Sequence, residues 1–132
     1  MNVARYASFL LVAASLTACA HSPDDAHSLD GMWHVEAAHA QARQTVVFDR
    51  DDRVHGHGGC NRWFADVLAN AAGQLRFGPV GATRRACLDD GMQERETAFL
   101  AMLEQVRSYR TVAADRVELL DAEGQTIGVL RR

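Results

Sequence analysis

Lysine is absent from this sequence, and all 14 basic side chains are arginine. The arginines are scattered along the chain and are outnumbered by 17 aspartate and glutamate residues, which gives a formal net charge of −3. A mildly acidic chain without a basic stripe is poorly suited to nucleic-acid phosphates, so no nucleic-acid partner is expected. With 132 residues, 48% of them hydrophobic and 23% charged, the sequence predicts one folded domain rather than a disordered chain.

The sequence also lacks a long apolar run. Its most apolar stretch, residues 7–16, is about ten residues long, whereas a membrane-spanning helix needs about 20. Arg5 precedes this stretch and residues 16–19 (LTAC) end it, which resembles the lipobox of a bacterial lipoprotein signal peptide. We therefore predict that residues 1–18 are a signal peptide, removed ahead of a lipid-bearing Cys19. An ordinary secretory signal with an incidental cysteine is the alternative.

A lipid on Cys19 would fix the protein to a membrane, because several acyl chains on one residue bind far more strongly than one. Ala20 stands where an aspartate favours retention in the inner membrane, so we predict the bacterial outer membrane, on its periplasmic face. Residues 19–28 are polar, include Pro23 and predict a short tether. The folded domain is then expected at residues 29–132.

Only two cysteines remain for the domain, Cys60 and Cys87. Two thiols in an oxidising compartment allow a single intramolecular pairing. A bridge between them closes a loop of roughly 28 residues, for which chain entropy gives about 3.5 kcal/mol of stabilisation. Two buried free thiols are the alternative.

Hydrophobic alternation predicts β-strands along most of the mature chain, as where Trp33 and Val35 alternate with polar neighbours. The predicted strands cover residues 29–36, 45–48, 53–57, 60–68, 75–77, 109–112, 117–120 and 126–130, with a short extended piece at 83–87. Short polar turns separate them at 49–52, 70–73, 113–115 and 121–124. This spacing is typical of an antiparallel meander.

One segment has helical periodicity instead. Phe99, Met102, Leu103 and Val106 follow i, i+3, i+4, i+7 spacing, which predicts an amphipathic helix over 90–107. Asp90 with a glutamine three residues later resembles a capping box. The predicted fold class is mainly β (α+β): a barrel-like antiparallel β-meander with one amphipathic helix packed on it.

Five motifs in order resemble the META domain family, which includes HslJ-like bacterial heat-shock lipoproteins. They are Gly31-Met32-Trp33, Gly59-Cys60-Asn61-Arg62-Trp63, Pro79 with Thr83-Arg84-Arg85-Ala86-Cys87, Phe99-Leu100 with Tyr109, and Leu119-Leu120-Asp121-Ala122-Glu123-Gly124. The resemblance covers residues 29–130. It departs from the family pattern at Arg85, where methionine is common, and at Ala65 and Val67, where the family often has a glycine and an aromatic residue.

The resemblance implies a compact β-meander in the cell envelope, linked to heat shock, envelope stress or antibiotic tolerance. It supplies no catalytic residue and no cofactor. We therefore expect a non-enzymatic lipoprotein that binds an unidentified envelope protein or small ligand. A small β-barrel inhibitor, or a carrier of a small ligand or metal, is the alternative. The Gly59-Cys60-Asn61 motif is interpreted mainly as structural, because glycine permits unusual backbone angles and asparagine bonds nearby backbone.

Four further patterns each have a plainer interpretation. His55 and His57 share one strand face and lie near Cys60, as a zinc or copper site requires. The disulfide would consume the thiolate and no fourth ligand is evident, so no metal is predicted. Mature serines occur only at positions 22, 28 and 108, without a nucleophile elbow, so no catalytic group is predicted.

The other two patterns concern arginines and aromatic residues. Arg84 and Arg85, with Arg62, could form a cationic patch for a carboxylate or an anionic headgroup. Solvation, or pairing with Asp89 and Asp90, is the plainer interpretation of these arginines. The three aromatic residues Trp33, Trp63 and Phe64 are expected in the core.

Overall fold

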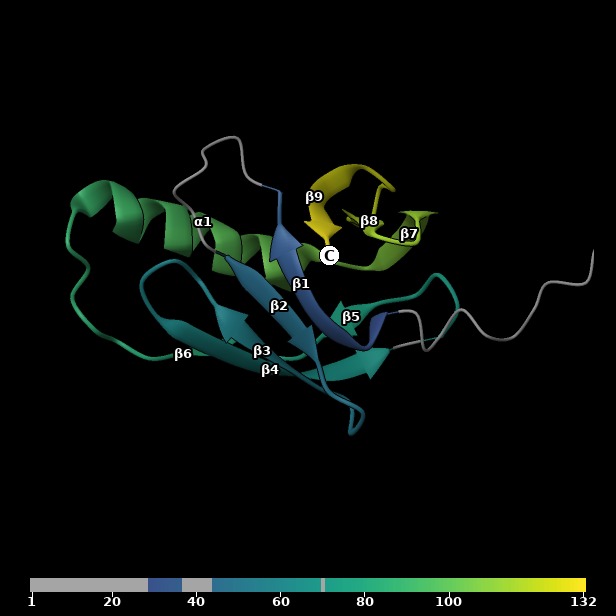
Figure 1. The fold of residues 1–132 in the computed structure, drawn as a ribbon, viewed down its shortest axis with the longest axis horizontal. Coiled ribbons are helices and arrows are strands. Elements are labelled where there is room, and N and C mark those ends of the chain that lie inside the picture. The colour runs from purple at the N-terminus through teal and green to yellow at the C-terminus, as the bar shows by residue number, and fades with distance from the viewer. Residues whose placement is uncertain (1–28, 37–43, 70) are drawn as a thin grey trace, which may run out of the picture.

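The computed structural model describes residues 29–36, 44–69 and 71–132, and Figure 1 shows their arrangement. The elements are β1 (Gly31–Val35), β2 (Thr45–Phe48), β3 (Arg53–His57), β4 (Arg62–Ala69), β5 (Arg76–Phe77), β6 (Gly81–Ala82), α1 (Asp90–Gln105), β7 (Ser108–Ala113), β8 (Arg116–Leu120) and β9 (Thr126–Arg131). The predicted fold class, mostly antiparallel β with one helix, is confirmed. The predictions for the signal peptide, Cys19 and the tether fall outside the described residues.

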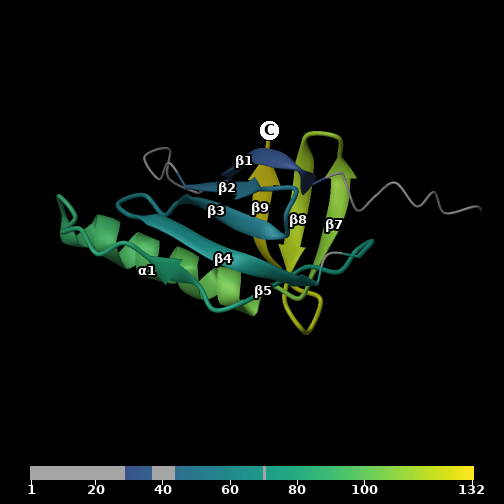
Figure 2. The same ribbon diagram turned by 90° about the horizontal axis from the view of Figure 1, so that it is seen from below.

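The strands form a single sheet in the order β5-β4-β3-β2-β1-β9-β8-β7, and β6 pairs with β4. Neighbours along the chain pair as hairpins, which short polar turns allow. The pairing of β1 with β9, His34 opposite Arg131 and Val35 opposite Leu130, joins the first and last described strands and was not predicted. Figure 2 shows β9 beside β1, with the β7–β8 hairpin beyond it.

The sheet curls but does not close. An isolated bridge between Gln74 and Ser108 brings its two ends together, and the Tyr109 backbone N–H donates to the carbonyl of Gly73 at 3.1 Å. Continuous pairing between β5 and β7 is missing from the described strands, so the term barrel-like fits the curvature only loosely.

The strand β4 shows how the alternating pattern becomes a two-sided surface. Trp63 and Ala65 are buried, whereas Phe64 between them and Asp66 after them face outward. The expectation that Phe64 belongs to the core is therefore wrong, because its ring is 59% exposed on the outer face. The piece predicted to be extended, residues 83–87, directly follows β6, which ends at Ala82, and is not assigned to a strand.

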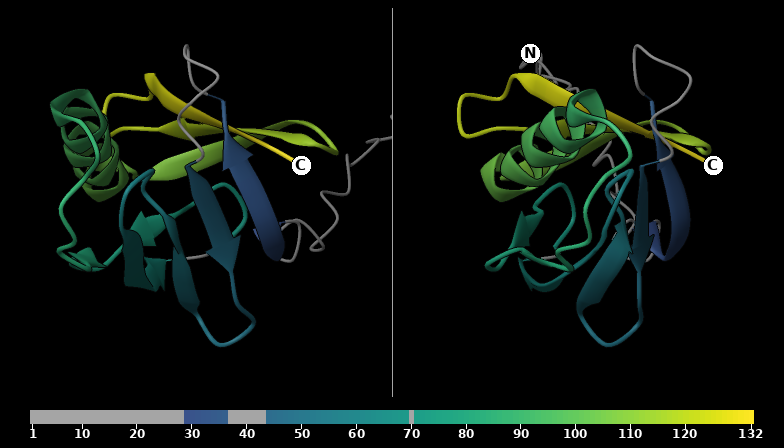
Figure 3. Two further views of the ribbon diagram at one scale, coloured as in Figure 1. Left: turned by 60° about the vertical axis from the view of Figure 1, so that its left-hand side comes forward. Right: turned by 90° about the vertical axis from the view of Figure 1, so that its left-hand side faces the viewer.

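Helix α1 begins at Asp90 as predicted, but its N-cap lies one residue earlier than predicted. Asp89, not Asp90, is the N-cap, and its carboxylate accepts from the Met92 backbone N–H at 2.6 Å. Phe99 and Leu103 are buried against the sheet, as the periodicity predicted. In Figure 3 the helix lies between the β7–β9 strands and the strands around β4.

The core fills the inside of the curled sheet. Trp63 and Phe99 meet edge to face, with ring centroids 5.9 Å apart, and so join β4 to α1. The core cluster consists of Leu29, Trp33, Val46, Phe48, Val54, Trp63, Ala65, Leu75, Phe77, Phe99, Leu103, Val106, Tyr109, Val117, Leu119 and Leu130. Among the described residues, none belongs to a helix with the length and apolarity required to span a bilayer.

Candidate functional site

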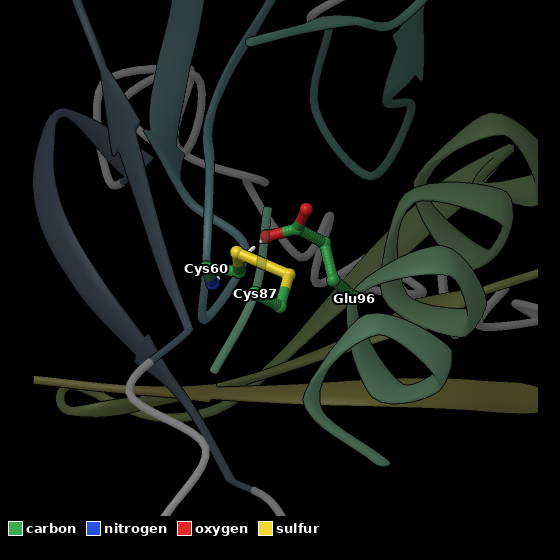
Figure 4. Close-up of side chains that lie close together, drawn as sticks. All are labelled: Cys60, Cys87 and Glu96. Atoms are coloured by element: carbon green, nitrogen blue, oxygen red, sulfur yellow. Dashed lines mark hydrogen bonds between the residues drawn. A yellow bond between two sulfur atoms is a disulfide. The ribbon is translucent and has the colours of Figure 1, made fainter. Parts of the chain in front are cut away.

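A disulfide joins the β3–β4 loop to the segment that leads into α1. Cys60 and Cys87 are bonded, with their Cα atoms 5.6 Å apart. Figure 4 shows the Glu96 side chain reaching from α1 toward this bridge. The β3–β4 loop, the segment before α1 and α1 itself therefore meet at one point.

The side-chain amide of Asn61 is the centre of the polar network at this point. Its Oδ1 accepts from the hydroxyl of Thr83 at 3.0 Å and from the backbone N–H of Arg85 at 2.7 Å. Its Nδ2 donates to the carbonyl of Arg85 at 3.3 Å and to Glu96 Oε1 at 2.7 Å. All four hydrogen-bonding positions of the amide are used, as a buried asparagine requires. The Asn61 amide thereby forms the hydrogen bonds that the backbone of a neighbouring strand would otherwise form, and it holds Thr83 and Arg85 in place.

Glu96 is a buried carboxylate on the core-facing side of α1. Its side chain is only 3% exposed. Oε2 accepts from two successive backbone N–H groups, those of Cys60 at 2.8 Å and Asn61 at 2.5 Å. The carboxylate on α1 thus supplies the hydrogen-bond acceptor for backbone N–H groups at the bend of the β3–β4 loop.

These contacts set the protonation state of Glu96. Burial raises the pKa of its carboxyl, but hydrogen bonds from the backbone and side chain of Asn61 and the backbone of Cys60, together with nearby His57, outweigh burial. The net effect lowers the pKa below its ordinary value of 4.5. Glu96 is therefore an anion at neutral pH and serves as an acceptor, not as a proton donor.

Two glycines allow the Glu96 carboxylate to lie this close to the β3–β4 loop. Gly59 has a φ of +115°, a conformation that side chains rarely adopt. A Cβ on Gly58 would lie 2.8 Å from the Glu96 carboxylate, so only glycine leaves room for it. Gln44 completes the contact, because its Nε2 donates to the carbonyls of Gly58 at 3.2 Å and Arg95 at 3.3 Å.

The structure brings most of the predicted motif residues together here, with one exception. Gly59, Cys60, Asn61, Thr83 and Cys87 all belong to this cluster, and Arg84 lies at its rim. Trp33 belongs to the core instead. Its Nε1 donates to the carbonyl of Leu29 at 2.8 Å, and the Arg132 guanidinium lies 4.1 Å from its ring centroid.

The histidines of the alternative metal site are engaged elsewhere. His55 Nε2 lies 3.4 Å from a carboxylate oxygen of Asp49, and His57 Nδ1 accepts from the backbone N–H of Gly59 at 3.1 Å. In the described part of the chain, the side chains closest to a three-ligand cluster are Cys60, Cys87 and Glu96, with ligand atoms within 4.8 Å. Both sulfurs are bonded to each other, and a disulfide offers no thiolate to a metal.

A groove opens beside the disulfide, between β6 with its following segment and one face of α1. Its volume is about 810 Å³, within the range of roughly 300–1,000 Å³ that is usual for ligand pockets. One wall consists of residues 80–86, and the other includes Gln93, Glu96 and Leu100. The polar network therefore forms the floor of a concave surface.

Neither Glu96 nor Gln44 was predicted as a site residue. The signal for Glu96 was present, because it lies three residues before Phe99 and seven before Leu103, and so on the same helix face. A carboxylate among core positions indicates a buried partner. For Gln44 no such signal exists, since it precedes a short strand without any distinguishing pattern.

Comparison with known proteins places the chain in a family. A model of the META domain matches residues 25–132. No curated protein matches the sequence. A solved NMR structure of a protein from Burkholderia xenovorans is 23% identical, with a TM-score of 0.64 and 98% of each chain covered.

A second structural neighbour is a DUF4847 family protein from Bacteroides vulgatus. It is 13% identical, with a TM-score of 0.55, and the match covers 81% of this chain and 95% of that one. At such identities the likeness concerns the fold alone. The family match spans most of the sequence and includes the disulfide, the Asn61 network and α1. The chain therefore belongs to the META domain family.

Proposed function

We propose that this META-domain protein is a lipid-anchored lipoprotein of the bacterial cell envelope that contributes to stress or antibiotic tolerance without catalysis, by binding another envelope component. The observation that carries the proposal is the Cys60–Cys87 disulfide, whose chain neighbours Asn61 and Ala86 line the groove. Disulfides persist in oxidising compartments such as the periplasm, which agrees with the export signal and lipobox of residues 1–19.

The groove supports binding rather than a reaction. The two cysteines beside it are joined to each other, and the Glu96 carboxylate accepts three hydrogen bonds from the protein. Neither group is a nucleophile or a general acid in this state. An ordered rim around a concave surface is what a binding site needs, because little ordering entropy is then lost on association.

The anchor is tested on the N-terminal peptide. Mass spectrometry of protein purified from its native membrane should find Cys19 as the first residue, carrying a diacylglyceryl group. Cys19→Ala should leave residues 1–18 uncleaved and release the protein from the outer-membrane fraction. A wild-type chain with an unmodified N-terminus would contradict the proposed anchor.

The binding role is tested by photocrosslinking in intact cells. A photoreactive residue at Phe64, which is 59% exposed at the groove, should give one discrete adduct with an envelope component. The same residue at Val112, 49% exposed on β7, is the matched control and should give none. A deletion strain should be more sensitive to heat or antibiotics. Equal labelling from both positions, or unchanged tolerance, would contradict the role.

A further inference from the structure

Two arginines at the rim of the groove have no acidic partner within the described residues. Arg84 and Arg85 are exposed and line the groove, and no ion pair involves either side chain. The expected pairing with Asp89 is not formed, because that carboxylate caps α1 and lies 3.8 Å from Arg95. Two guanidinium groups therefore remain available to an anionic ligand.

Among the strands that the structure describes, β6 pairs only with β4, so its other edge is unpaired there as well. In the β4–β6 ladder, Trp63 lies opposite Ala82, and the Thr83 N–H donates to the carbonyl of Arg62 at 2.9 Å. Hydrogen-bonded and non-bonded pairs alternate in an antiparallel ladder, so the Trp63–Ala82 pair exchanges no hydrogen bonds. The N–H and C=O of Ala82 therefore point away from β4.

The register of the β3–β4 ladder also indicates that Trp63 and Ala82 exchange no hydrogen bonds. The Gly58 N–H donates to the carbonyl of Asn61, and the Val67 N–H donates to the carbonyl of Asp52. The odd-numbered residues of β4 therefore form their backbone hydrogen bonds with β3, and Trp63 is one of them. The backbone N–H and C=O of Trp63 are thus not available to Ala82.

The free edge continues for two more residues. The backbone N–H and C=O of Arg85 are held by the Asn61 side chain, whereas within the described residues the backbone of Arg84 has no partner. Ala82 and Arg84 are two residues apart and so present their backbone groups on the same side. The Asn61 network thereby lengthens a two-residue strand into a longer docking edge.

Apolar side chains complete the groove. Val80 and Leu100 line it from opposite walls, and the exposed ring of Phe64 lies at its outer side. An extended peptide directs alternate side chains to opposite faces, so one set can contact these apolar groups while the other reaches the arginines. This combination matches the recognition mode in which a peptide adds a strand to a sheet edge.

We propose that this groove binds an extended acidic peptide segment of another protein, which pairs with the backbone of Ala82 and Arg84 and places carboxylates against the Arg84 and Arg85 guanidinium groups. The inference rests on the proposed function, since it names the site and the chemistry of the envelope partner. A lipid headgroup offers the negative charge but not the repeating backbone donors and acceptors. The unpaired edge therefore favours a peptide over a membrane surface.

The experiment uses synthetic peptides and the protein purified as the cell produces it. The probe is a capped peptide of alternating valine and glutamate, and binding is measured by fluorescence polarisation. It should bind, and the valine–glutamine analogue and a copy methylated at every backbone nitrogen should each bind about tenfold more weakly or worse. On binding, the amide NMR signals of Ala82 and Arg84 should shift and exchange more slowly with solvent.

Matched variants locate the charge contact. The double variant Arg84→Gln/Arg85→Gln should weaken binding of the acidic peptide about tenfold or more. Arg76→Gln is the control, because Arg76 is an exposed arginine on β5 outside the groove and should leave affinity unchanged. Thermal unfolding verifies that each variant is folded.

Three outcomes would overturn the inference. They are no binding of the acidic peptide, equal binding of the backbone-methylated copy, and binding only to phosphatidylglycerol vesicles with the same dependence on Arg84 and Arg85. The last outcome would assign the arginines to a lipid. Each leaves the proposed function separately testable, because lipidation of Cys19 and crosslinking in cells do not depend on these probes.

Discussion

Asn61 and Glu96 are 35 residues apart in sequence and hold each other through two hydrogen bonds. The Asn61 Nδ2 donates to Glu96 Oε1 at 2.7 Å, and the Asn61 backbone N–H donates to Oε2 at 2.5 Å. Both side chains are buried, with 4% and 3% of their surfaces exposed. A neutral amide and an anion thus join the β3–β4 loop to α1 inside the protein, where an unpaired partner would be costly.

Replacement of Glu96 by glutamine should destabilise the domain. A glutamine side chain has the size of glutamate. Its NH2 group is a donor, however, and it would face N–H groups that are donors too and need an acceptor. We expect Glu96→Gln to lower the free energy of unfolding by about 1–3 kcal/mol, measured by urea denaturation. Glu94→Gln is the matched control on an exposed position of α1 and should stay within about 0.5 kcal/mol. Equal unfolding of the two variants would show that the buried carboxylate is not needed.

The same carboxylate should make stability depend on pH. The folded state lowers the pKa of Glu96 below 4.5, so its stabilisation is complete above that value and is lost as the pH falls through the folded pKa. We expect the free energy of unfolding to decrease as the pH is lowered below 4.5, and to decrease less steeply in Glu96→Gln. Some slope should remain, because hydrogen bonds from Arg131 and Arg110 also lower the pKa values of Glu36 and Glu118. Parallel pH profiles would contradict the assignment.

Removal of the disulfide should destabilise the folded domain without abolishing its fold. We expect Cys60→Ala/Cys87→Ala to lower the free energy of unfolding by about 2–4 kcal/mol, since the unfolded chain gains entropy. Dithiothreitol should lower the stability of the wild type and leave the double variant unchanged. If both proteins respond equally to dithiothreitol, or if alkylation finds free thiols in the native protein, the bridge is not formed in solution.

A side chain at Gly58 should be tolerated only when Glu96 is shortened. The added Cβ of Gly58→Ala would lie 2.8 Å from the Glu96 carboxylate, so we expect the variant to lose stability in the wild-type background. In the Glu96→Ala background the same change should cost much less, which a double-mutant cycle measures as a coupling energy. Gly78→Ala is the control, because its nearest contacts are 3.6–3.7 Å. Additive effects of the two changes would contradict the predicted clash.

Local patterns predicted most of the fold, because each hairpin and the helix depend on nearby residues. Trp33, Phe99 and Leu103 are buried as the two periodicities predicted, and Val35 is partly buried against the same core. The pairing of β1 with β9 could not be read in the same way. It joins two segments that are far apart in the sequence, and no local pattern specifies that register.

The disulfide of the site was predicted, whereas most of its hydrogen-bond network was not. The number of cysteines identified Cys60 and Cys87, since two thiols allow one pairing. Asn61 was expected to bond nearby backbone, whereas it bonds a segment more than 20 residues away and Glu96 on α1. The sequence shows which side chain can form hydrogen bonds but not which distant partner the fold supplies. Phe64 illustrates the opposite error, in which an aromatic residue expected inside lies on the outer face.

The bond between Cys60 and Cys87 makes a covalent ring of the intervening chain, which contains β4, β5 and β6. A protease that cuts once anywhere inside this ring cannot separate the two pieces. The nicked protein would migrate as a single band on a denaturing gel and divide into two fragments only after a reductant is added. Damage to the part of the molecule that carries the free strand edge would therefore not, by itself, detach it from the rest of the chain.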